Sequence, residues 1–442
     1  MPLSVEWGHC GLVILNQPNR ANLHFKCKIA QNSGAMTERY IRRELETVLA
    51  RAADQFPAVV LTGPRQSGKT TLLKHMFGRT HGYVSLEPPD VRAAASADPR
   101  GFLAMHAPPV IMDEVQYAPD LLPYIKERID AHRSEAGQYL LTGSQNLLLM
   151  DRVTESLAGR TAMLRLLPLS WREAKGHAGI PLYWEDESAT RMGEAIESAE
   201  LWRSILLGGY PELVASPNRD ATLWHAAYVQ TYLERDVRSL RQVGDLASFQ
   251  SFLRALAARN GQLLKLSELA SDLGIAVNTA KGWLSVLEAS FQVIVLRPYF
   301  ANVGKRLVRT PKVYFTDTGT LCYLVGLRDA SHAVAGPMGG ALFETAVLME
   351  IVKTFVHRGQ EPPVYFWRTS TGSEVDIVVD TGGRLVPIEV KLSATPHPPM
   401  AKGILGLRAA LGDLVAPGYV VHPGDSRLPL GPNATSLPFS AL

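Results

Sequence analysis

Hydrophobic and polar positions along the chain first follow the spacing of a helix. After Met36, the apolar residues Ile41, Leu45, Val48 and Leu49 recur among charged residues at helical spacing, which predicts an amphipathic opening helix. Residues 1–35 show no such period, and we interpret them as a disordered leader or an over-long start of the reading frame. The folded part is therefore expected to begin near residue 36.

Short apolar runs then alternate with helical patterns. The runs read AVVLTG, GYVSLEPPD, PPVIMDEVQ and QYLLTGSQN, and a helix begins directly after the first of them. Strands and helices that alternate in this order form a parallel sheet flanked by helices. The fold class expected for this part is α/β.

The first run leads into GPRQSGKT, which satisfies GxxxxGK[ST] between a strand and a helix. Glycines allow backbone N–H groups to surround a β-phosphate, while Lys69 reaches the β- and γ-phosphates and Thr70 binds Mg²⁺. The motif predicts a P-loop that binds ATP and Mg²⁺. The residues expected to contact ATP are Gly63, Pro64, Arg65, Gln66, Ser67, Gly68, Lys69, Thr70 and Thr71.

Polar residues end two of the later runs. Asp113 is expected to hold the magnesium-bound water and Glu114 to polarise the attacking water as a general base. An acidic pair after a strand can also be an exposed loop, but its place downstream of a P-loop favours the catalytic interpretation. Ser144 and Gln145, with Asn146 next to them, end the fourth run where a sensor of the γ-phosphate is expected.

Cleavage of the γ-phosphate develops charge that an arginine can stabilise, often from a neighbouring element or subunit. Arg160 in LAGRT is one candidate, and Arg235 or Arg238 in YLERDVRSL is another. The alternative for each is an exposed or salt-bridged arginine. GGYPEL and LPLSWREA are interpreted as packing and turn elements around the site.

The chain resembles the bacterial and archaeal ATPases that join an AAA+ type P-loop domain to a C-terminal domain of unknown function with a nuclease-like core. The motifs that carry the resemblance cover about residues 40–425: LTGPRQSGKTTL, VIMDEVQ, YLLTGSQN, SLAGRTAMLRLLPLS, GGYPE, TYLERDV, KVYFTDTG and the closing EVDIVV and IEVK. The resemblance implies ATP hydrolysis by an AAA+ type domain, expected over residues 36–240 with a helical lid. It also allows a homo-oligomer, since AAA+ relatives often need an arginine from a neighbouring subunit.

Residues 241–333 change to short helices and predict a winged helix. A first helix near Ser267 and Glu268, a turn at Gly274 and a second helix entered near Asn278 and Thr279 make a helix-turn-helix. Contacts with nucleic acid, most simply DNA, are expected from Asn278, Thr279, Lys281 and the basic residues Arg297, Lys305, Arg306, Arg309 and Lys312. Winged helices also mediate oligomerisation, and this alternative stays open.

Residues 334–442 read as helix, three strands, helix and strand, the order of the PD-(D/E)xK nuclease fold, which this part resembles. The resemblance implies a restriction-endonuclease-like α/β domain. In it, Asp376 matches the motif aspartate, and Glu389 and Lys391 match the ExK. Glu344 lies in line with the apolar stripe of the preceding helix and is expected to point inward.

These residue types fit metal-assisted cleavage of a phosphodiester. Mg²⁺ prefers oxygen ligands, and Asp376 and Glu389 on adjacent strands can share one ion, with Glu344 as a further ligand. Lys391, two residues after Glu389, lies on the same strand face and can orient or activate water. The alternatives are a domain that binds without cutting and a purely structural cluster in which Glu389 pairs with Lys391 near Asp376 and Arg368.

Composition narrows the class of protein without changing this interpretation. With 442 residues, 46% hydrophobic and 20% charged, the chain is typical of a folded protein of two to four domains. The net charge of +3 requires any nucleic-acid surface to be a local patch. Cys10, Cys27 and Cys322 lack CxxC spacing, and no apolar run approaches the roughly 20 residues of a membrane span, so a cytoplasmic location is expected.

Two functions therefore remain. In the first, ATP hydrolysis drives remodelling or translocation on DNA that the C-terminal site cleaves. In the second, the ATPase is a molecular switch whose C-terminal half binds a protein partner or nucleic acid without cleavage, in a toxin-antitoxin or mobile-element role that only the resemblance suggests.

Overall fold

The computed structural model describes residues 40–143, 156–186, 196–216, 218–233, 246–299 and 308–442. Some predicted features lie outside these ranges. They are the leader at residues 1–35, Ser144, Gln145 and Asn146, the arginines Arg235 and Arg238, and the basic residues Lys305 and Arg306.

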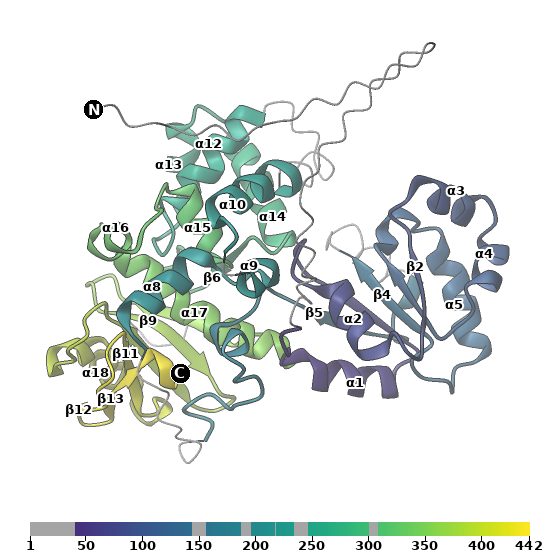
Figure 1. The fold of residues 1–442 in the computed structure, drawn as a ribbon. Helices are drawn as coiled ribbons and strands as arrows, with labels where there is room; N and C mark the ends of the chain where they lie inside the picture. The colour runs from purple at the N-terminus through teal and green to yellow at the C-terminus, as the bar shows by residue number, and fades with distance from the viewer. Residues whose placement is uncertain (1–39, 144–155, 187–195, 217, 234–245, 300–307) are drawn as a thin grey trace, which may run out of the picture. The chain divides into compact units, whose positions relative to one another are not determined.

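The N-terminal part is the predicted parallel α/β sheet (Figure 1). Its strand order is β2-β3-β4-β1-β5, and every neighbouring pair of strands is parallel. The strands are β1 (Ala58–Thr62), β2 (Gly82–Ser85), β3 (Val110–Asp113), β4 (Tyr139–Gly143) and β5 (Thr161–Arg165). The helices are α1 (Leu45–Gln55), α2 (Lys69–Phe77), α3 (Pro89–Ala97), α4 (Pro99–Met105) and α5 (Leu121–Ala131), with the 3-10 turn η1 (Val115–Tyr117) after β3.

Alternating residues of each strand divide the core of this sheet between its two faces. Val59 and Leu61 of β1 pack in a cluster with α1 and α2, whereas Ala58 and Val60 pack in a second cluster with α4 and α5. Because both faces are covered, the central strands β1, β3 and β4 are buried along their whole length, whereas the edge strands β2 and β5 are partly exposed. Parallel strands also bring their carboxyl ends to one edge, where the P-loop follows β1 and Asp113 ends β3.

Helices dominate the middle of the chain. They are α7 (Trp171–Ala174), α8 (Ser198–Leu207), α9 (Pro211–Ala215), α10 (Ala221–Tyr228), the π-helical η3 (Val229–Leu233), α12 (Leu246–Ala257), α13 (Leu266–Asp272), α14 (Val277–Ala289), α15 (Thr318–Leu324) and α16 (Ala330–Ala335). An antiparallel pair, β6 (Val293–Leu296) and β7 (Lys312–Phe315), follows α14. The segment predicted to form a helix-turn-helix contains the helices α13 and α14 with Gly274, φ 65°, between them, and the winged helix stays a prediction.

The C-terminal part has the predicted order of helix, three strands, helix and strand, with two further strands. Its sheet runs β12-β13-β11-β10-β9-β8, and β10 pairs antiparallel with β9 and parallel with β11. The elements are α17 (Gly339–His357), β8 (Val364–Arg368), β9 (Glu374–Asp380), β10 (Leu385–Val390), η4 (Pro398–Ala401), α18 (Lys402–Leu411), η5 (Gly412–Leu414), β11 (Gly418–His422), β12 (Pro429–Gly431), β13 (Ala434–Pro438) and η6 (Phe439–Ala441).

One hydrophobic core joins the middle and C-terminal parts. It includes Trp202 of α8, Phe252 of α12, Tyr314 of β7, Phe343 of α17 and Val421 of β11. Both predicted boundaries, at residues 240/241 and 333/334, fall between residues that contribute to this core. The middle and C-terminal parts therefore stabilise each other through common apolar contacts.

Candidate functional site

The P-loop takes a conformation that needs glycine at both ends. Gly63 has φ 147°, and a Cβ there would overlap the backbone carbonyl of Leu166. Gly68 has φ 93° and precedes the first residue of α2. Both φ values lie where L side chains are strained, so the loop can pass close to β5 and enter α2 only with glycine.

Lys69 begins α2 and its ammonium group lies inside the loop. Its Nζ donates to the carbonyls of Gly63 at 3.0 Å and Pro64 at 2.8 Å, and only 6% of the residue is exposed. The N–H groups in the first turn of α2, a helix of nine residues, point toward the same loop. The ammonium group and the helix N-terminus together form an anion site.

The other predicted ATP contacts surround this site in different environments. Arg65 and Ser67 are buried, Gln66 has a left-handed φ of 63°, and Thr71 is exposed on α2. Pro211, at the start of α9, lies next to Gly68, and the N–H of Leu169 donates to the carbonyl of Gly209 at 2.7 Å. GGYPEL thus packs around the P-loop as predicted.

Three hydroxyl groups donate to the carboxylate of Asp113. Thr70 Oγ1 lies 2.9 and 3.0 Å from the two oxygens, Tyr83 Oη lies 3.1 Å from Oδ2, and Thr142 Oγ1 donates to Oδ1. Burial, with Asp113 nearby, raises the pKa of Tyr83 to about 12, so the phenol keeps its proton to donate. The Thr70 hydroxyl and the Asp113 carboxylate are hard oxygen donors, which fit Mg²⁺. Tyr83 and Thr142 were not predicted, although both lie on the strands that flank β3.

Glu114 follows Asp113 in a left-handed conformation. Its φ is 57°, its N–H donates to Thr142 Oγ1 at 3.1 Å, and its Oε2 accepts from Gln116 Nε2. A non-glycine residue with this φ is uncommon and such residues concentrate at functional sites. This turn brings Glu114 to the same edge of the sheet as Lys69 and Thr70.

Arg43, just before α1, is a buried arginine that the sequence did not single out. It is 4% exposed, and its guanidinium donates to Ser67 O at 3.0 Å, Leu167 O at 2.7 Å and Glu173 Oε1 at 3.1 Å. One side chain therefore joins the P-loop, the segment after β5 and α7. Its cationic neighbours in sequence, in the run RYIRRELE, gave no signal that this arginine is buried.

Glu173 accepts a hydrogen bond from Arg43 and also contacts the end of α17. Burial would raise the pKa of the Glu173 carboxyl, but Arg43 and His357 outweigh burial and hold the pKa below its usual range. Glu173 Oε2 lies 3.2 Å from Nδ1 of His357, the last residue of α17, and the other ring nitrogen of His357 accepts from Leu167 N at 3.1 Å. The carboxylate thus remains ionised beside the Arg43 guanidinium.

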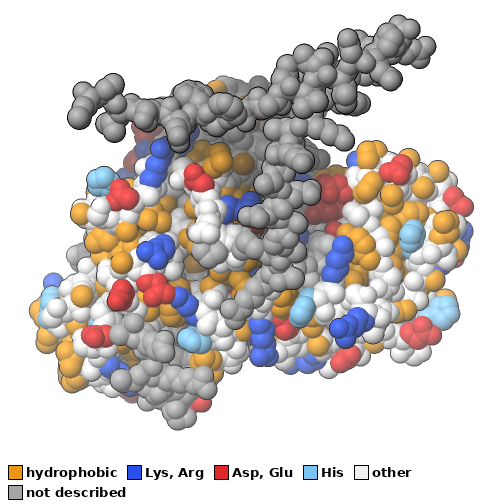
Figure 2. Space-filling view, in the orientation of Figure 1, with side chains coloured by type: hydrophobic (Ala, Val, Ile, Leu, Met, Phe, Trp, Pro, Cys, Tyr) orange, Lys and Arg blue, Asp and Glu red, His pale blue; other side chains and the backbone are white. Residues whose placement is uncertain are grey.

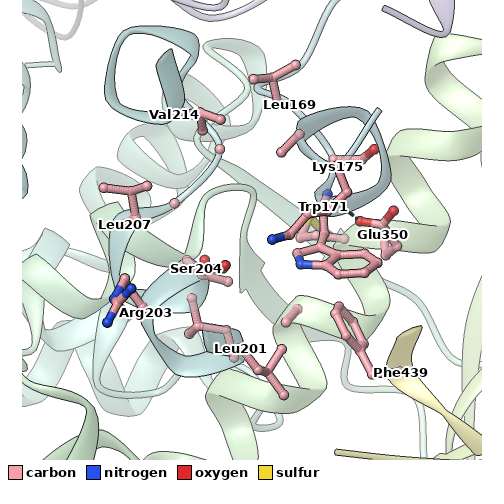
Figure 3. A pocket seen from close by; sticks show the side chains of 18 of the residues that line it. Leu169, Trp171, Lys175, Leu201, Arg203, Ser204, Leu207, Val214, Glu350 and Phe439 are labelled. Carbon is pink, nitrogen blue, oxygen red and sulfur yellow. Dashed lines mark hydrogen bonds between the residues drawn. The ribbon is translucent and has the colours of Figure 1, made fainter. Parts of the chain in front are cut away.

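A cavity of about 310 Å³ lies where α7, α8 and α17 meet (Figure 3). Glu350 of α17 accepts from the backbone N–H groups of Trp171 at 2.8 Å and Arg172 at 3.1 Å, at the N-terminus of α7. Lys353, one turn later, donates to the carbonyl of Leu169 at 3.0 Å. α17 therefore holds the segment after β5 through polar contacts along its last two turns.

Arg160 lies at the amino ends of the parallel strands, whereas the P-loop lies at their carboxyl ends. It precedes β5, whose first residue pairs with Ala58, whereas the P-loop follows Thr62 at the far end of the parallel strand β1. Its guanidinium forms an ion pair with Asp130, at 2.6 Å from Nε to Oδ1. Arg160 does not reach the ATP site of its own chain, so only a neighbouring copy could bring it to a γ-phosphate.

The C-terminal acid–lysine cluster comprises Asp376, Glu389 and Lys391. Lys391 Nζ lies 2.6 Å from Glu389 Oε2 and 3.4 Å from Asp376 Oδ2, and the Val390 N–H donates to Asp376 Oδ2 at 2.8 Å. Burial and the nearby Asp376 raise the pKa of Glu389 to about 8 although Lys391 opposes them. The structure brings these three side chains together as the strand spacing predicts.

Glu344 has a different set of partners on the same sheet face. Lys312 Nζ lies 3.2 Å from Glu344 and 2.8 Å from Glu374, and the Tyr314 hydroxyl donates to Glu344. Burial raises the pKa of Glu344 to about 7, with Asp376 adding to the rise and Lys312 opposing it. Glu344 and Asp376 line a cavity of about 520 Å³ together with Lys312, Arg368 and residues of the segment between α12 and α13.

Among the described residues, no group of three or more His, Cys, Asp and Glu is close enough to hold a metal ion. Glu344, Asp376 and Glu389 therefore do not form one three-carboxylate site, because Lys312 and Lys391 each hold one of the glutamates. A metal role for Asp376 and Glu389 remains a prediction. The ion pair of Glu389 with Lys391 is present as the structural alternative expected, but Arg368 pairs with Glu374, at 3.0 Å, rather than with Asp376.

The predicted nucleic-acid contacts divide into exposed and buried residues. Asn278 and Lys281 at the start of α14, and the basic residues Arg297 and Arg309, are exposed. Lys312 is only 4% exposed, so its ion pairs with Glu344 and Glu374 remove it from the predicted basic surface. On the face in Figure 2, the described Lys and Arg side chains are interspersed with Asp and Glu.

Family models match three parts of the chain. The model described as an AAA domain matches residues 55–175, a domain of unknown function (DUF8612) matches residues 198–331, and a domain of unknown function (DUF4143) matches residues 339–442. Two mycobacterial relatives, the uncharacterized proteins Rv2008c of Mycobacterium tuberculosis and Mb2031c of Mycobacterium bovis, are 33% identical over 424 residues, which is 95% of this chain and 88% of each relative. The chain belongs to the family of these mycobacterial proteins.

In this family member, the AAA domain match contains the P-loop and Asp113, so the N-terminal part is a P-loop ATPase domain of AAA type. The match to DUF4143 covers the acid–lysine cluster and describes no activity for it. An uncharacterized protein of Haemophilus influenzae is 22% identical over 295 residues, 62% of this chain and 70% of that protein.

Solved structures are more distant. A Walker-type ATPase of Pyrococcus abyssi is 16% identical, with a TM-score of 0.44 over 65% of this chain and 97% of that one. The RuvB Holliday junction branch migration motor of Thermotoga maritima is 18% identical, with a TM-score of 0.26 over 57% of this chain and 88% of that one. Both TM-scores are too low to transfer a site. Within the described ranges, no helix is long and apolar enough to cross a membrane.

Proposed function

We propose that this protein hydrolyses ATP at the P-loop of its AAA domain. The observation that carries the proposal is the pair formed by the Thr70 hydroxyl and the Asp113 carboxylate, 2.9 Å apart, beside the N-terminus of α2 and Lys69. Mg²⁺ bound there would neutralise phosphate charge. Hard oxygen donors and a phosphate-binding loop at one edge of a sheet suit a nucleoside triphosphate with its metal.

Three residues have distinct roles in this proposal. Before ATP binds, the ammonium group of Lys69 is already directed into the loop by the carbonyls of Gly63 and Pro64. When ATP binds, phosphate oxygens replace these two carbonyls as its partners. Asp113 accepts from Thr70 and orients that hydroxyl. Glu114, directed to the same edge by its left-handed backbone, accepts a proton from the attacking water.

The experiment compares a variant that should lose ATP binding with a variant that should lose only ATP turnover. Lys69→Ala should abolish both ATP binding and turnover, whereas Glu114→Gln should retain binding and lower turnover by about 100-fold. Arg79→Ala, at an exposed position just after α2, is the control and should behave as wild type. Hydrolysis that survives Lys69→Ala would overturn the proposal.

A second function is favoured by the convergence of Asp376, Glu389 and Lys391 on one sheet face. We propose that this cluster cleaves nucleic acid with the help of a divalent metal, as its resemblance to PD-(D/E)xK nucleases implies. Exposed residues at the start of α14 would contact the sugar-phosphate backbone of the nucleic acid. Metal entry would have to displace Lys391 from Glu389. Cleavage of DNA in Mg²⁺ or Mn²⁺ that Glu389→Ala abolishes would support the proposal, and cleavage that persists in this variant would remove the site.

The alternative without cleavage draws on the same ion pairs. Each of Glu344 and Glu389 already has a lysine partner, so the cluster can be stable with no metal. In this alternative the ATPase is a switch whose C-terminal half binds nucleic acid or a protein partner, in a monomer or a homo-oligomer. DNA-stimulated ATP turnover without any cleavage, in either metal, would favour it.

A further inference from the structure

We infer that Arg43 is a positioning residue for the P-loop and that α17 of the C-terminal part controls its position. The inference rests on the proposed ATPase function and adds a group outside the P-loop motif. Its basis is the set of three hydrogen bonds from one buried guanidinium to Ser67, Leu167 and Glu173.

The contact with Ser67 acts on the phosphate-binding N–H of the next residue. A peptide unit is planar and trans, so its C=O and N–H point in opposite directions. Arg43 binds the Ser67 carbonyl at 3.0 Å, so the Gly68 N–H of the same peptide points away from Arg43. A cation on the carbonyl also polarises the peptide and strengthens that N–H as a donor.

The position of the guanidinium is fixed from the other side by Glu173. This carboxylate is fully buried and also accepts from the backbone N–H groups of Glu44 and Ser170, at 2.9 Å each. A planar guanidinium that holds three acceptors at once has one orientation, and lysine cannot reproduce it. Small shifts of Glu173 would therefore move Arg43 and, with it, the Ser67–Gly68 peptide.

Contacts from α17 hold Glu173 and its surroundings. His357 lies 3.2 Å from Glu173 and accepts from Leu167 N, whose residue also supplies a carbonyl to Arg43. Arg358, directly after α17, lies 2.6 Å from Glu44. The end of α17 therefore contacts both partners of the Arg43 guanidinium outside the P-loop, Leu167 and Glu173.

The same helix carries Glu344 near its start, beside the acid–lysine cluster. α17 therefore connects the acid–lysine cluster near its start with the surroundings of the P-loop at its end. Coupling between two binding sites is reciprocal. Binding of ATP should thus alter the end of α17, and changes at the end of α17 should alter the affinity for ATP.

The first test measures the affinity of a fluorescent ATP analogue, with Mg²⁺, for the full chain. Arg43→Lys should raise the dissociation constant about tenfold, because one charge-assisted hydrogen bond to the loop is lost. Arg128→Lys is the matched control: this half-buried arginine of α5 donates from its guanidinium to the carbonyl of Leu103 at 2.6 Å, not to the P-loop. Both variants should lose thermal stability, but only Arg43→Lys should lose affinity.

The second test addresses α17. His357→Ala should weaken binding of the same analogue about threefold, and His357→Gln, whose amide offers one donor and one acceptor, should restore part of the loss. In the wild-type chain, ATP with Mg²⁺ should slow hydrogen exchange in the last two turns of α17.

The outcomes separate the inference from the function on which it rests. Wild-type protein that binds no ATP overturns the proposed function. Wild-type protein that binds ATP, with Arg43→Lys binding equally well, overturns the positioning role alone. Hydrogen exchange of α17 that does not respond to ATP overturns the coupling, even where a variant fails to fold.

Discussion

At the end of β3, the Asp113 carboxylate accepts from the hydroxyl groups of Thr70, Tyr83 and Thr142, whereas at the end of β10 the Glu389 carboxylate is paired with the ammonium group of Lys391. Hydroxyl groups satisfy a carboxylate without neutralising it, so Asp113 keeps its attraction for a cation that arrives with a ligand. Lys391 supplies one cation from within the chain to both Asp376 and Glu389, and burial favours a net neutral cluster in which the two acids share one negative charge. The difference shows that carboxylates in similar strand-end positions can be prepared for a metal or already compensated.

Removal of the Asp113 charge gives the largest expected effect on this comparison. Asp113→Asn keeps the size of the side chain but loses the attraction for Mg²⁺, so we expect ATP turnover to fall about 100-fold. Steady-state turnover measured over a range of Mg²⁺ concentrations checks this. Asp54→Asn, at an exposed position near the end of α1, should have no effect. Equal turnover in Asp113→Asn and wild type would mean that the hydroxyl-bound carboxylate is not the metal side of the site.

Packing around Glu389 provides the next effect. A methyl group at Gly403 of α18 would overlap both the Glu389 carboxylate and the Glu374 carbonyl, so Gly403→Ala should lower the free energy of unfolding by about 2 kcal/mol. Gly406 lies one turn later, where an added Cβ would come no closer than 4.0 Å to its nearest neighbour, Ser373. Gly406→Ala should raise stability by up to about 1 kcal/mol, because alanine favours the helix. Urea denaturation measures both, and similar values for the two would contradict a tightly enclosed carboxylate.

Protonation of Glu389 gives a smaller, pH-dependent effect. Its pKa is raised from 4.5 to about 8, so the folded state holds a proton that the unfolded state has released in this interval. This contribution to stability is complete below about pH 4.5 and is lost as the pH rises toward 8. Relative to Glu389→Gln, wild-type protein should therefore lose about 1 kcal/mol or more of unfolding free energy from pH 5 to pH 8. The exposed Glu87→Gln should not change the pH profile, and a Glu389→Gln profile parallel to wild type would argue for an ionised Glu389 throughout.

Arg160 is expected to produce the smallest effect. Its ion pair with Asp130 is on the surface, so Arg160→Ala should leave the stability of the fold nearly unchanged. At dilution, ATP turnover should equal that of wild type, since Arg160 lies at the edge of the sheet opposite the P-loop. Turnover that rises with protein concentration in wild type, but not in Arg160→Ala, would reveal an arginine donated between copies.

The sequence predicted the parts of this structure that depend on local spacing. Apolar runs gave the parallel sheet, GxxxxGK[ST] gave the loop, and the period of two gave the common face of Asp376, Glu389 and Lys391. Partners from distant segments could not be predicted in this way: Arg43 meets Glu173 across 130 positions, and Lys312 meets Glu344 across 32. A lysine in a basic run is predicted to be exposed, because the sequence does not reveal the distant acids that bury it. For this reason the sequence predicts Lys312 on a nucleic-acid surface, whereas the structure buries it.

The core shared by the middle and C-terminal parts has a consequence for how such proteins change over time. Trp202, Phe252 and Tyr314 pack in the same cluster as Phe343 and Val421, although they belong to matches with two different families of unknown function. Exchange of either part between relatives would bring together apolar surfaces that did not evolve in contact. We therefore expect residues 198–331 and 339–442 to be inherited together as a single unit of recombination.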